Sequence, residues 1–198
     1  IKSLQKIKEK ILNLQVGGIT GISNAVVRKE EDVKIGDLGK VGKIPIESIF
    51  LSSTVENLCD CRAEVVNELQ SKGIKVIHSE SPEFAGIPRN NVYDICLQNV
   101  LSSSHFVIII DRKYGELYQG TRYERFKGIS ITHAEFKVAL ENEEKPILFY
   151  VRDCVWHHYR IWKDNPGLKC DIDDASVFEI IKEFDIKNVK SVNAVFDI

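Results

Sequence analysis

Residues 105–111 read H-F-V-I-I-I-D, an apolar run that begins at His105 and ends on Asp111. An uninterrupted run of this kind predicts a central β-strand that is buried on both faces of a sheet. On either side of it, short apolar runs alternate with segments of helical periodicity. We expect strands at 46–51, 74–78, 105–111 and 146–151, and helices at 57–72, 90–102 and 131–143.

This alternation predicts right-handed crossovers and a parallel sheet. We therefore expect an α/β, flavodoxin-like three-layer fold with a central parallel sheet of four to five strands. Its strand order would be 2-1-3-4, with a further helix at 174–184 and a possible fifth strand at 191–196. In such sheets ligands bind at the carboxyl ends of the strands, where the strand order reverses. The polar tips at 52–54 and 111–115 are therefore the first candidates for a ligand site.

The region before the first strand has a different character. Residues 1–15 predict an amphipathic helix, because apolar residues recur there at spacings of 3, 4 and 3. Two interpretations remain open for it: a helix packed on its own domain, or part of a longer oligomerising helix. Residues 17–43 are rich in glycine and predict loops with a small hairpin. We divide the chain into an N-terminal helix and Gly-rich segment at 1–44 and an α/β domain at 45–198.

The composition is 43% hydrophobic and 28% charged, which is ordinary for a soluble globular protein. The net charge of -2 provides no basic field, so we expect no nucleic-acid partner. No apolar run approaches the roughly 18 residues of a membrane span, so we expect no membrane association and a cytoplasmic location.

The five cysteines are odd in number and match no disulfide framework, which favours a reducing compartment. One possible set of zinc ligands consists of Cys154, His157, His158 and Cys170. They lack the tightly spaced pairs of structural zinc sites, and adjacent histidines tend to point apart. We therefore expect no metal.

Two strand tips carry candidate ligand-binding residues. Three hydroxyls at 52–54 can hydrogen-bond a phosphate or a ribose, although a helix N-cap formed by Thr54 or Asn57 is the commoner role of such residues. At 111–115, an acid, a base and a tyrosine are well placed for a ligand. The alternative at that tip is a turn with Gly115 at positive φ and a surface ion pair.

Glu135 also has two interpretations. Thr132 and Glu135 fit a capping box, with the threonine as N-cap and the glutamate at N3. The same placement puts the carboxylate near the switch point of the sheet. A carboxylate there can stabilise the oxocarbenium character that develops when a base leaves a ribose.

Four motifs together resemble a widespread family of uncharacterised TIR-like domains, found in NTPase-linked signalling and defence proteins. The family is related to TIR domains and nucleoside deoxyribosyltransferases. The motifs are I-F-L-S-S-T (49–54), I-I-I-D-R-K-Y-G (108–115), G-I-S-I-T-H-A-E-F (128–136) and K-P-I-L-F-Y (145–150).

The resemblance covers about residues 46–151. It implies that Glu135 is the catalytic glutamate. One departure is Asn57-Leu58, where the family usually has Asp-Leu. The resemblance also implies a set of substrate-binding residues: Ser52, Ser53, Thr54, Arg62, Asp111, Arg112, Tyr114, Gly115, Ser130 and Thr132.

The function implied by this resemblance is N-glycosidic cleavage of a nucleotide, with NAD hydrolysed or cyclised in signalling or antiviral defence. NAD would be the substrate, and no separate cofactor is expected. Two alternatives remain: a non-catalytic TIR-like module for oligomerisation and signalling, or a deoxyribosyltransferase-like enzyme acting on nucleosides or deoxynucleotides. The expected partners are a small nucleotide and further copies of the chain.

Overall fold

The computed structural model describes residues 46–84, 87–167, 171–187 and 192–196. The amphipathic helix expected at 1–15 and the Gly-rich segment at 17–43 lie outside these residues, so both stay predictions.

A five-stranded, all-parallel sheet forms the centre of the fold, in the order β2-β1-β3-β4-β5. This is the flavodoxin-like order expected from the alternating strands and helices, with the fifth strand present. The central strand is the apolar run at 105–110, and all six of its residues are buried. The strands are β1 (Ser48–Ser53), β2 (Lys75–Ile77), β3 (His105–Ile110), β4 (Ile147–Arg152) and β5 (Val192–Phe196).

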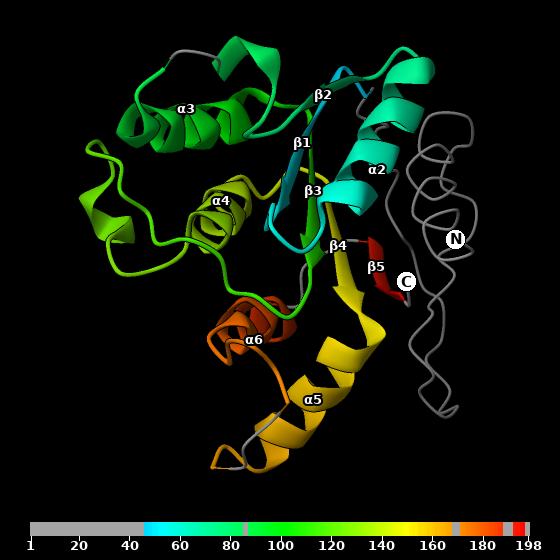
Figure 1. Ribbon diagram of the computed structural model, residues 1–198, viewed down its shortest axis with the longest axis vertical. Coiled ribbons are helices and arrows are strands. Elements are labelled where there is room, and N and C mark those ends of the chain that lie inside the picture. Colours follow the sequence, from blue (N-terminus) through cyan, green and yellow to red (C-terminus); the bar gives the residue numbers. More distant parts are fainter. Residues whose placement is uncertain (1–45, 85–86, 168–170, 188–191, 197–198) are drawn as a thin grey trace.

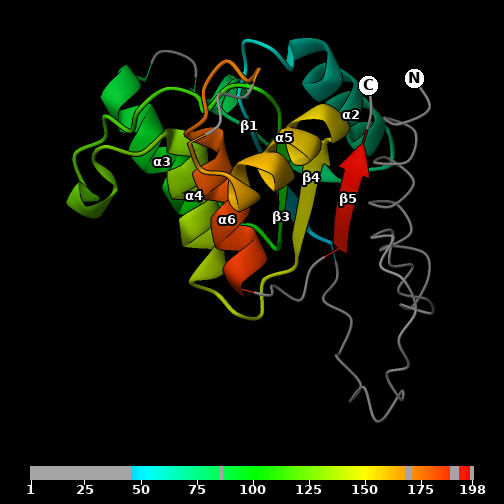
Figure 2. The ribbon, with the colours of Figure 1, turned by 90° about the horizontal axis from the view of Figure 1, so that it is seen from below.

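Helices cover both faces of the sheet. α2 (Cys59–Ser71) lies on one face, and α3 (Arg89–Ser102), α4 (Ile131–Leu140) and α6 (Val177–Lys187) lie on the other (Figures 1 and 2). Successive strand residues point to opposite faces. In β1, Leu51 packs in the α2 cluster and Phe50 packs in the cluster on the other face.

One helix was missed by the sequence interpretation, which placed no helix between the strand at 146–151 and the helix at 174–184. α5 (Asp153–Asp164) begins directly at the carboxyl end of β4 and runs away from the sheet (Figure 1). Its sequence is dominated by charged and aromatic residues, and only Val155 and Tyr159 are fully buried. Val155, Tyr159 and Trp162 nevertheless recur at the spacing of one helix face, so the sequence carries a helical signal that was missed. No turn residues separate the helix from the strand.

The long segment after β3 is folded back on α3 by a buried carboxylate. Asp94 of α3 accepts hydrogen bonds from the hydroxyl of Tyr118, the backbone and hydroxyl of Thr121, and the backbone of Arg122. Two short 3-10 helices, η1 (Pro82–Phe84) and η2 (Glu124–Phe126), complete the fold. Asp94 thus ties the segment to α3, and backbone hydrogen bonds from Tyr118 to Ile129 and from Ile131 to Glu116 hold its two ends together.

Gly120 lies against this carboxylate, and Gly120→Ala should destabilise the protein by about 2 kcal/mol. A Cβ at this position would overlap both Asp94 Oδ1 and the Tyr118 hydroxyl. Urea unfolding measures the change, and Gly167→Ala is the matched control because a Cβ there meets nothing within 4 Å. Equal stability of the two variants would contradict the role given to Asp94.

Within the described ranges, no helix is both long and apolar enough to cross a membrane.

Candidate functional site

The site is built around the carboxyl end of β1, where neighbouring serines face opposite sides of the sheet. Ser52 points towards α4, and its Oγ donates a hydrogen bond of 2.5 Å to Glu135 Oε2. Ser53 points towards α2, and Arg62 Nη1 donates to its Oγ at 2.6 Å and to its carbonyl oxygen at 3.1 Å. Because successive strand residues point to opposite faces, Glu135 and Arg62 are bound on opposite sides of one strand tip.

Glu135 is buried, with only 4% of its surface exposed. Burial disfavours the charged carboxylate and raises its pKa to about 7. The hydrogen bond from Ser52 and the positive charge of Arg62 act in the opposite direction. The result is a carboxylate that changes its charge near neutral pH, as catalytic acids and bases commonly do.

The capping box expected between Thr132 and Glu135 is wrong. The N-cap of α4 is Ser130, whose hydroxyl accepts a hydrogen bond of 3.2 Å from the backbone N–H of His133. α4 therefore begins with Ile131, and Glu135 lies beyond its first turn. Glu135 therefore has no capping role, and its carboxylate contacts β1 instead.

The N-cap expected from Thr54 or Asn57 is also wrong. The residue at the N-cap of α2 is Leu58, and no side chain caps that helix. The hydroxyl of Thr54 donates 2.5 Å to Asn57 Oδ1 across the turn. At this tip, the hydroxyls of Ser52 and Ser53 contact Glu135 and Arg62 rather than a helix end.

A cavity of about 780 Å³ opens between the tip of β1, α3, α4 and the segment after β3. This volume lies within the range of small-molecule sites. Glu135, Arg62, Ser53, Thr54, Tyr114, Gly115 and Thr132 are the predicted residues that line it. Ser52 and Ser130 do not line the cavity. Ser52 hydrogen-bonds Glu135, which does line it, and Ser130 caps the helix that carries Glu135.

Gly115 allows the segment after β3 to approach the tip of β1. Its φ is +91°, and a Cβ there would lie 3.0 Å from Thr54 Cγ2 and 3.6 Å from Thr132 Oγ1. The positive φ expected at this position is confirmed.

Asp111 and Arg112 do not line the cavity. The buried carboxylate of Asp111 lies 3.3 Å from Arg152 Nε of β4. Arg112 turns outwards and contacts Asp171 and Asp173, each at 3.4 Å. The surface ion pair considered from the sequence is therefore confirmed, and Arg112 acts as a link to the C-terminal part of the chain.

The family described as Domain of unknown function (DUF4062) matches residues 48–198, more than half of the chain. The chain belongs to the DUF4062 family. The match includes α5, α6 and β5, and so it extends beyond the motifs at 49–150. No curated protein matches the chain.

Several residues of the DUF4062 site were not predicted from the sequence. Ser79 and Glu80 follow β2, and both contact Arg62. Their position directly after a strand could have identified them, because β2 ends at the same edge of the sheet as β1. Asp173 and Asp174 also line the cavity, but they precede α6 by only a few residues and no motif marks them.

Metal-binding groups were sought in the described part of the DUF4062 domain. There, no three or more His, Cys, Asp or Glu side chains gather in a way that could hold a metal ion. The rings of His157 and His158 lie 6.0 Å apart at an interplanar angle of 82°. Cys170, the fourth residue of the zinc set considered above, lies outside the described residues.

Proposed function

We propose that this DUF4062 domain cleaves the N-glycosidic bond of a nucleotide, with NAD as substrate, and that it is related to TIR domains. The observation that carries the proposal is the buried carboxylate of Glu135. It lines a cavity of about 780 Å³ and has a pKa raised to about 7.

The proposed reaction breaks the bond between C1′ of the ribose and the nitrogen of the base. The bonding electrons leave with the base, so nicotinamide departs as a neutral molecule. The ribose gains oxocarbenium character, which the ionised carboxylate of Glu135 stabilises. Water then adds its oxygen to C1′ and releases a proton, or a nucleophile within the same molecule closes a ring.

The surrounding residues support this role. Ser52 keeps the carboxylate of Glu135 in place through its hydrogen bond of 2.5 Å. The hydroxyl of Ser53 accepts from Arg62 and can still donate to a ribose or phosphate oxygen, whereas that of Thr54 donates to Asn57 and can still accept from a ribose hydroxyl. Thr132 also lines the cavity wall. Tyr114 supplies an aromatic surface for the base.

The charge of the cavity favours a second candidate substrate class. Among the described residues, five acidic and two basic side chains line it. Of the two basic ones, Arg62 contacts Glu80, and Lys113 contacts Glu56 at 2.6 Å. Because the lining is mostly acidic and both basic side chains already pair with glutamates, the cavity favours a nucleoside without negatively charged phosphates. Such a substrate is the one used in deoxyribosyltransferase-like chemistry.

Chromatographic analysis of the products tests both candidates. The protein is incubated at high concentration, because self-association is expected, with NAD and with a panel of nucleosides and deoxynucleotides. Release of nicotinamide supports NAD cleavage, and release or exchange of a base from nucleosides alone supports the second candidate. No product from any compound, at a concentration where the chain self-associates, would overturn the proposed enzyme and leave a binding module.

The rate should depend on pH through Glu135. Only the ionised carboxylate stabilises a cation, so kcat/KM, which reports groups of the free protein, should rise with pH through a midpoint near 7. Ser52→Ala removes a hydrogen bond that favours ionisation, and so it should move the midpoint to higher pH. Initial rates between pH 5 and 9 measure both effects. A midpoint that is the same in both proteins would contradict the role of Ser52.

A further inference from the structure

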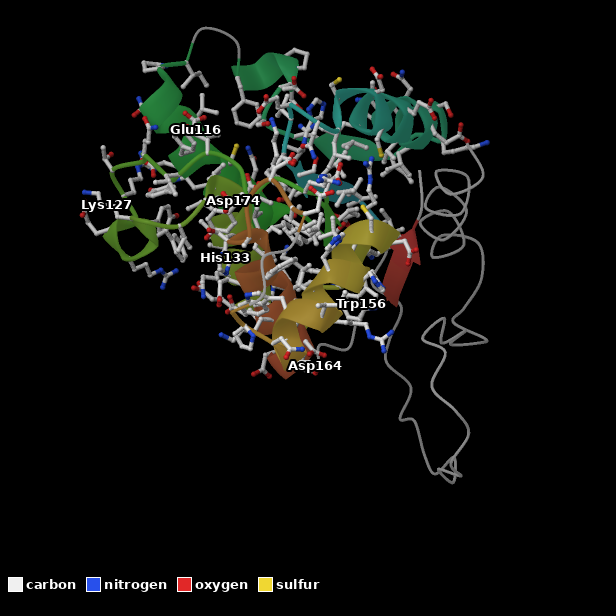
Figure 3. All side chains as sticks on the ribbon, turned by 60° about the horizontal axis from the view of Figure 1, so that its bottom comes forward. Glu116, Lys127, His133, Trp156, Asp164 and Asp174 are labelled. Carbon is white, nitrogen blue, oxygen red and sulfur yellow. The ribbon has the colours of Figure 1, made fainter. Side chains whose placement is uncertain are left out.

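A chain of hydrogen bonds connects the cavity wall to the C-terminal helix. The hydroxyl of Tyr114 lies 2.8 Å from His133 Nδ1, and His133 Nε2 lies 2.9 Å from Glu183 Oε2 of α6. Lys137 Nζ, one turn after His133 on α4, contacts the same carboxylate at 2.8 Å. Figure 3 shows His133 beside α6. The side chains of Tyr114 and His133 are buried.

The direction of the hydrogen bond between His133 and Glu183 follows from the state of Glu183. The hydrogen bond from His133, opposed by burial and assisted by Lys137, lowers the pKa of Glu183 to about 2. An ionised carboxylate accepts hydrogen bonds only, so His133 Nε2 carries a proton. Nδ1 shares the second hydrogen bond with the hydroxyl of Tyr114, and its direction depends on whether Nδ1 carries a proton.

The ring of Tyr114 is also held by packing. It contacts the ring of His133 edge to face, with centroids 5.8 Å apart. The next residue, Gly115, lies against Thr54 and Thr132 at the cavity. Any displacement of Tyr114 would therefore move the wall opposite the tip of β1.

We infer that His133 and Glu183 are positioning residues that hold Tyr114 in the wall of the cavity, so that helix α6 helps to set the affinity of the site. His133 lies two residues before Glu135, and residues at this spacing face different sides of a helix. α4 thus presents the catalytic carboxylate on one side and supports the aromatic wall on another. The effect on catalysis rests on the proposed function.

Two variants break the chain in different ways. His133→Phe keeps an aromatic ring against Tyr114 but removes both hydrogen bonds. Glu183→Gln keeps an acceptor oxygen but removes the charge. A hydrogen bond that holds Tyr114 in its binding position can improve the affinity at most by its own worth, about threefold to tenfold, so we expect KM to rise by up to that factor. kcat should change less, because Tyr114 contacts the base in the ground state and the transition state alike.

Asp185→Asn is a matched control on the same helix. Asp185 also accepts a hydrogen bond from a tyrosine, Tyr159, at 3.2 Å, and contacts Lys163. Asp185 and Tyr159 do not line the cavity. This variant therefore reproduces the loss of a carboxylate from α6 without breaking the link to Tyr114.

The test uses the whole chain labelled with 3-fluorotyrosine and read by fluorine NMR. The sequence contains six tyrosines, and Tyr114→Phe assigns the resonance of Tyr114. We expect His133→Phe and Glu183→Gln to shift this resonance, and Asp185→Asn to leave it in place. KM and kcat for NAD are measured on the same proteins.

A shifted Tyr114 resonance together with a higher KM than in Asp185→Asn supports the inference. An unchanged resonance in both variants overturns it, as does a shifted resonance with the KM of the control. A wild-type protein that cleaves nothing overturns the proposed function alone. In that case the shift of the Tyr114 resonance in the two variants still tests whether α6 positions Tyr114.

Discussion

Glu135→Gln should lower kcat at least a hundredfold while the fold stays intact. The amide has nearly the shape of the carboxylate, but it carries no negative charge to stabilise a ribosyl cation. Removing one group that stabilises the charge of a transition state lowers kcat by a factor on the order of 10²–10³. The loss should appear mainly in kcat, because the charge develops only in the transition state.

Glu141→Gln provides the matched control for this variant. Glu141 is the C-cap of the same helix, is exposed, and pairs with Arg125 at 2.7 Å far from the cavity lining. Circular dichroism and thermal unfolding establish that both variants are folded. Turnover by a folded Glu135→Gln protein within threefold of Glu141→Gln would exclude Glu135 as the catalytic residue.

The wild-type protein should lose stability between pH 5 and 8 through Glu135, and Glu135→Gln should lack this loss. The pKa of Glu135 is about 7 in the folded protein, against 4.5 for the ordinary side chain. Between these values the folded state binds more protons at this residue than the unfolded state. Its contribution to the free energy of unfolding therefore falls as pH rises, by about 2–3 kcal/mol in all.

Urea unfolding of both proteins at pH 5 and pH 8 measures this difference. Titrations of all other residues cancel in the comparison, so the stability of Glu135→Gln relative to wild type should increase by about 2–3 kcal/mol between the two pH values. Parallel pH dependence in the two proteins would show that Glu135 titrates normally. In that case the environment described for its carboxylate would be wrong.

These two predictions concern one physical arrangement. An ionised carboxylate buried beside Ser52 destabilises the folded chain near neutral pH, and the same burial makes its charge effective in the cavity. A substitution that stabilises the protein at pH 8 is expected to remove its activity. This opposition of stability and activity is common at functional sites.

The sheet could be predicted from the sequence because its strands are short, apolar and separated by helical periodicity. Strand β3 is the clearest case, since all six of its residues are buried. Helix α5 was missed, although its apolar residues recur with the period of a helix. Only Val155 and Tyr159 are fully buried, and the charged and histidine residues around them give the segment the composition of a polar loop.

The candidate site was predicted where residues belong to a strand tip or to a motif. Ser52 and Glu135 are examples, and the structure brings them to 2.5 Å. The partners of Arg112 and His133 lie about 50 to 60 residues away in the chain, at Asp171 and Glu183. Spacing in one sequence does not reveal such pairs, because they depend on where α6 and the segment before it lie in the folded chain.

The most direct test of the account is the release of nicotinamide from NAD by the wild-type chain and by Glu135→Gln, measured side by side at a concentration where the chain self-associates. We expect release by the wild type, with a rate that rises through pH 7, and almost none by the variant. Equal release by both folded proteins, or no cleavage of NAD by the wild type, would contradict it.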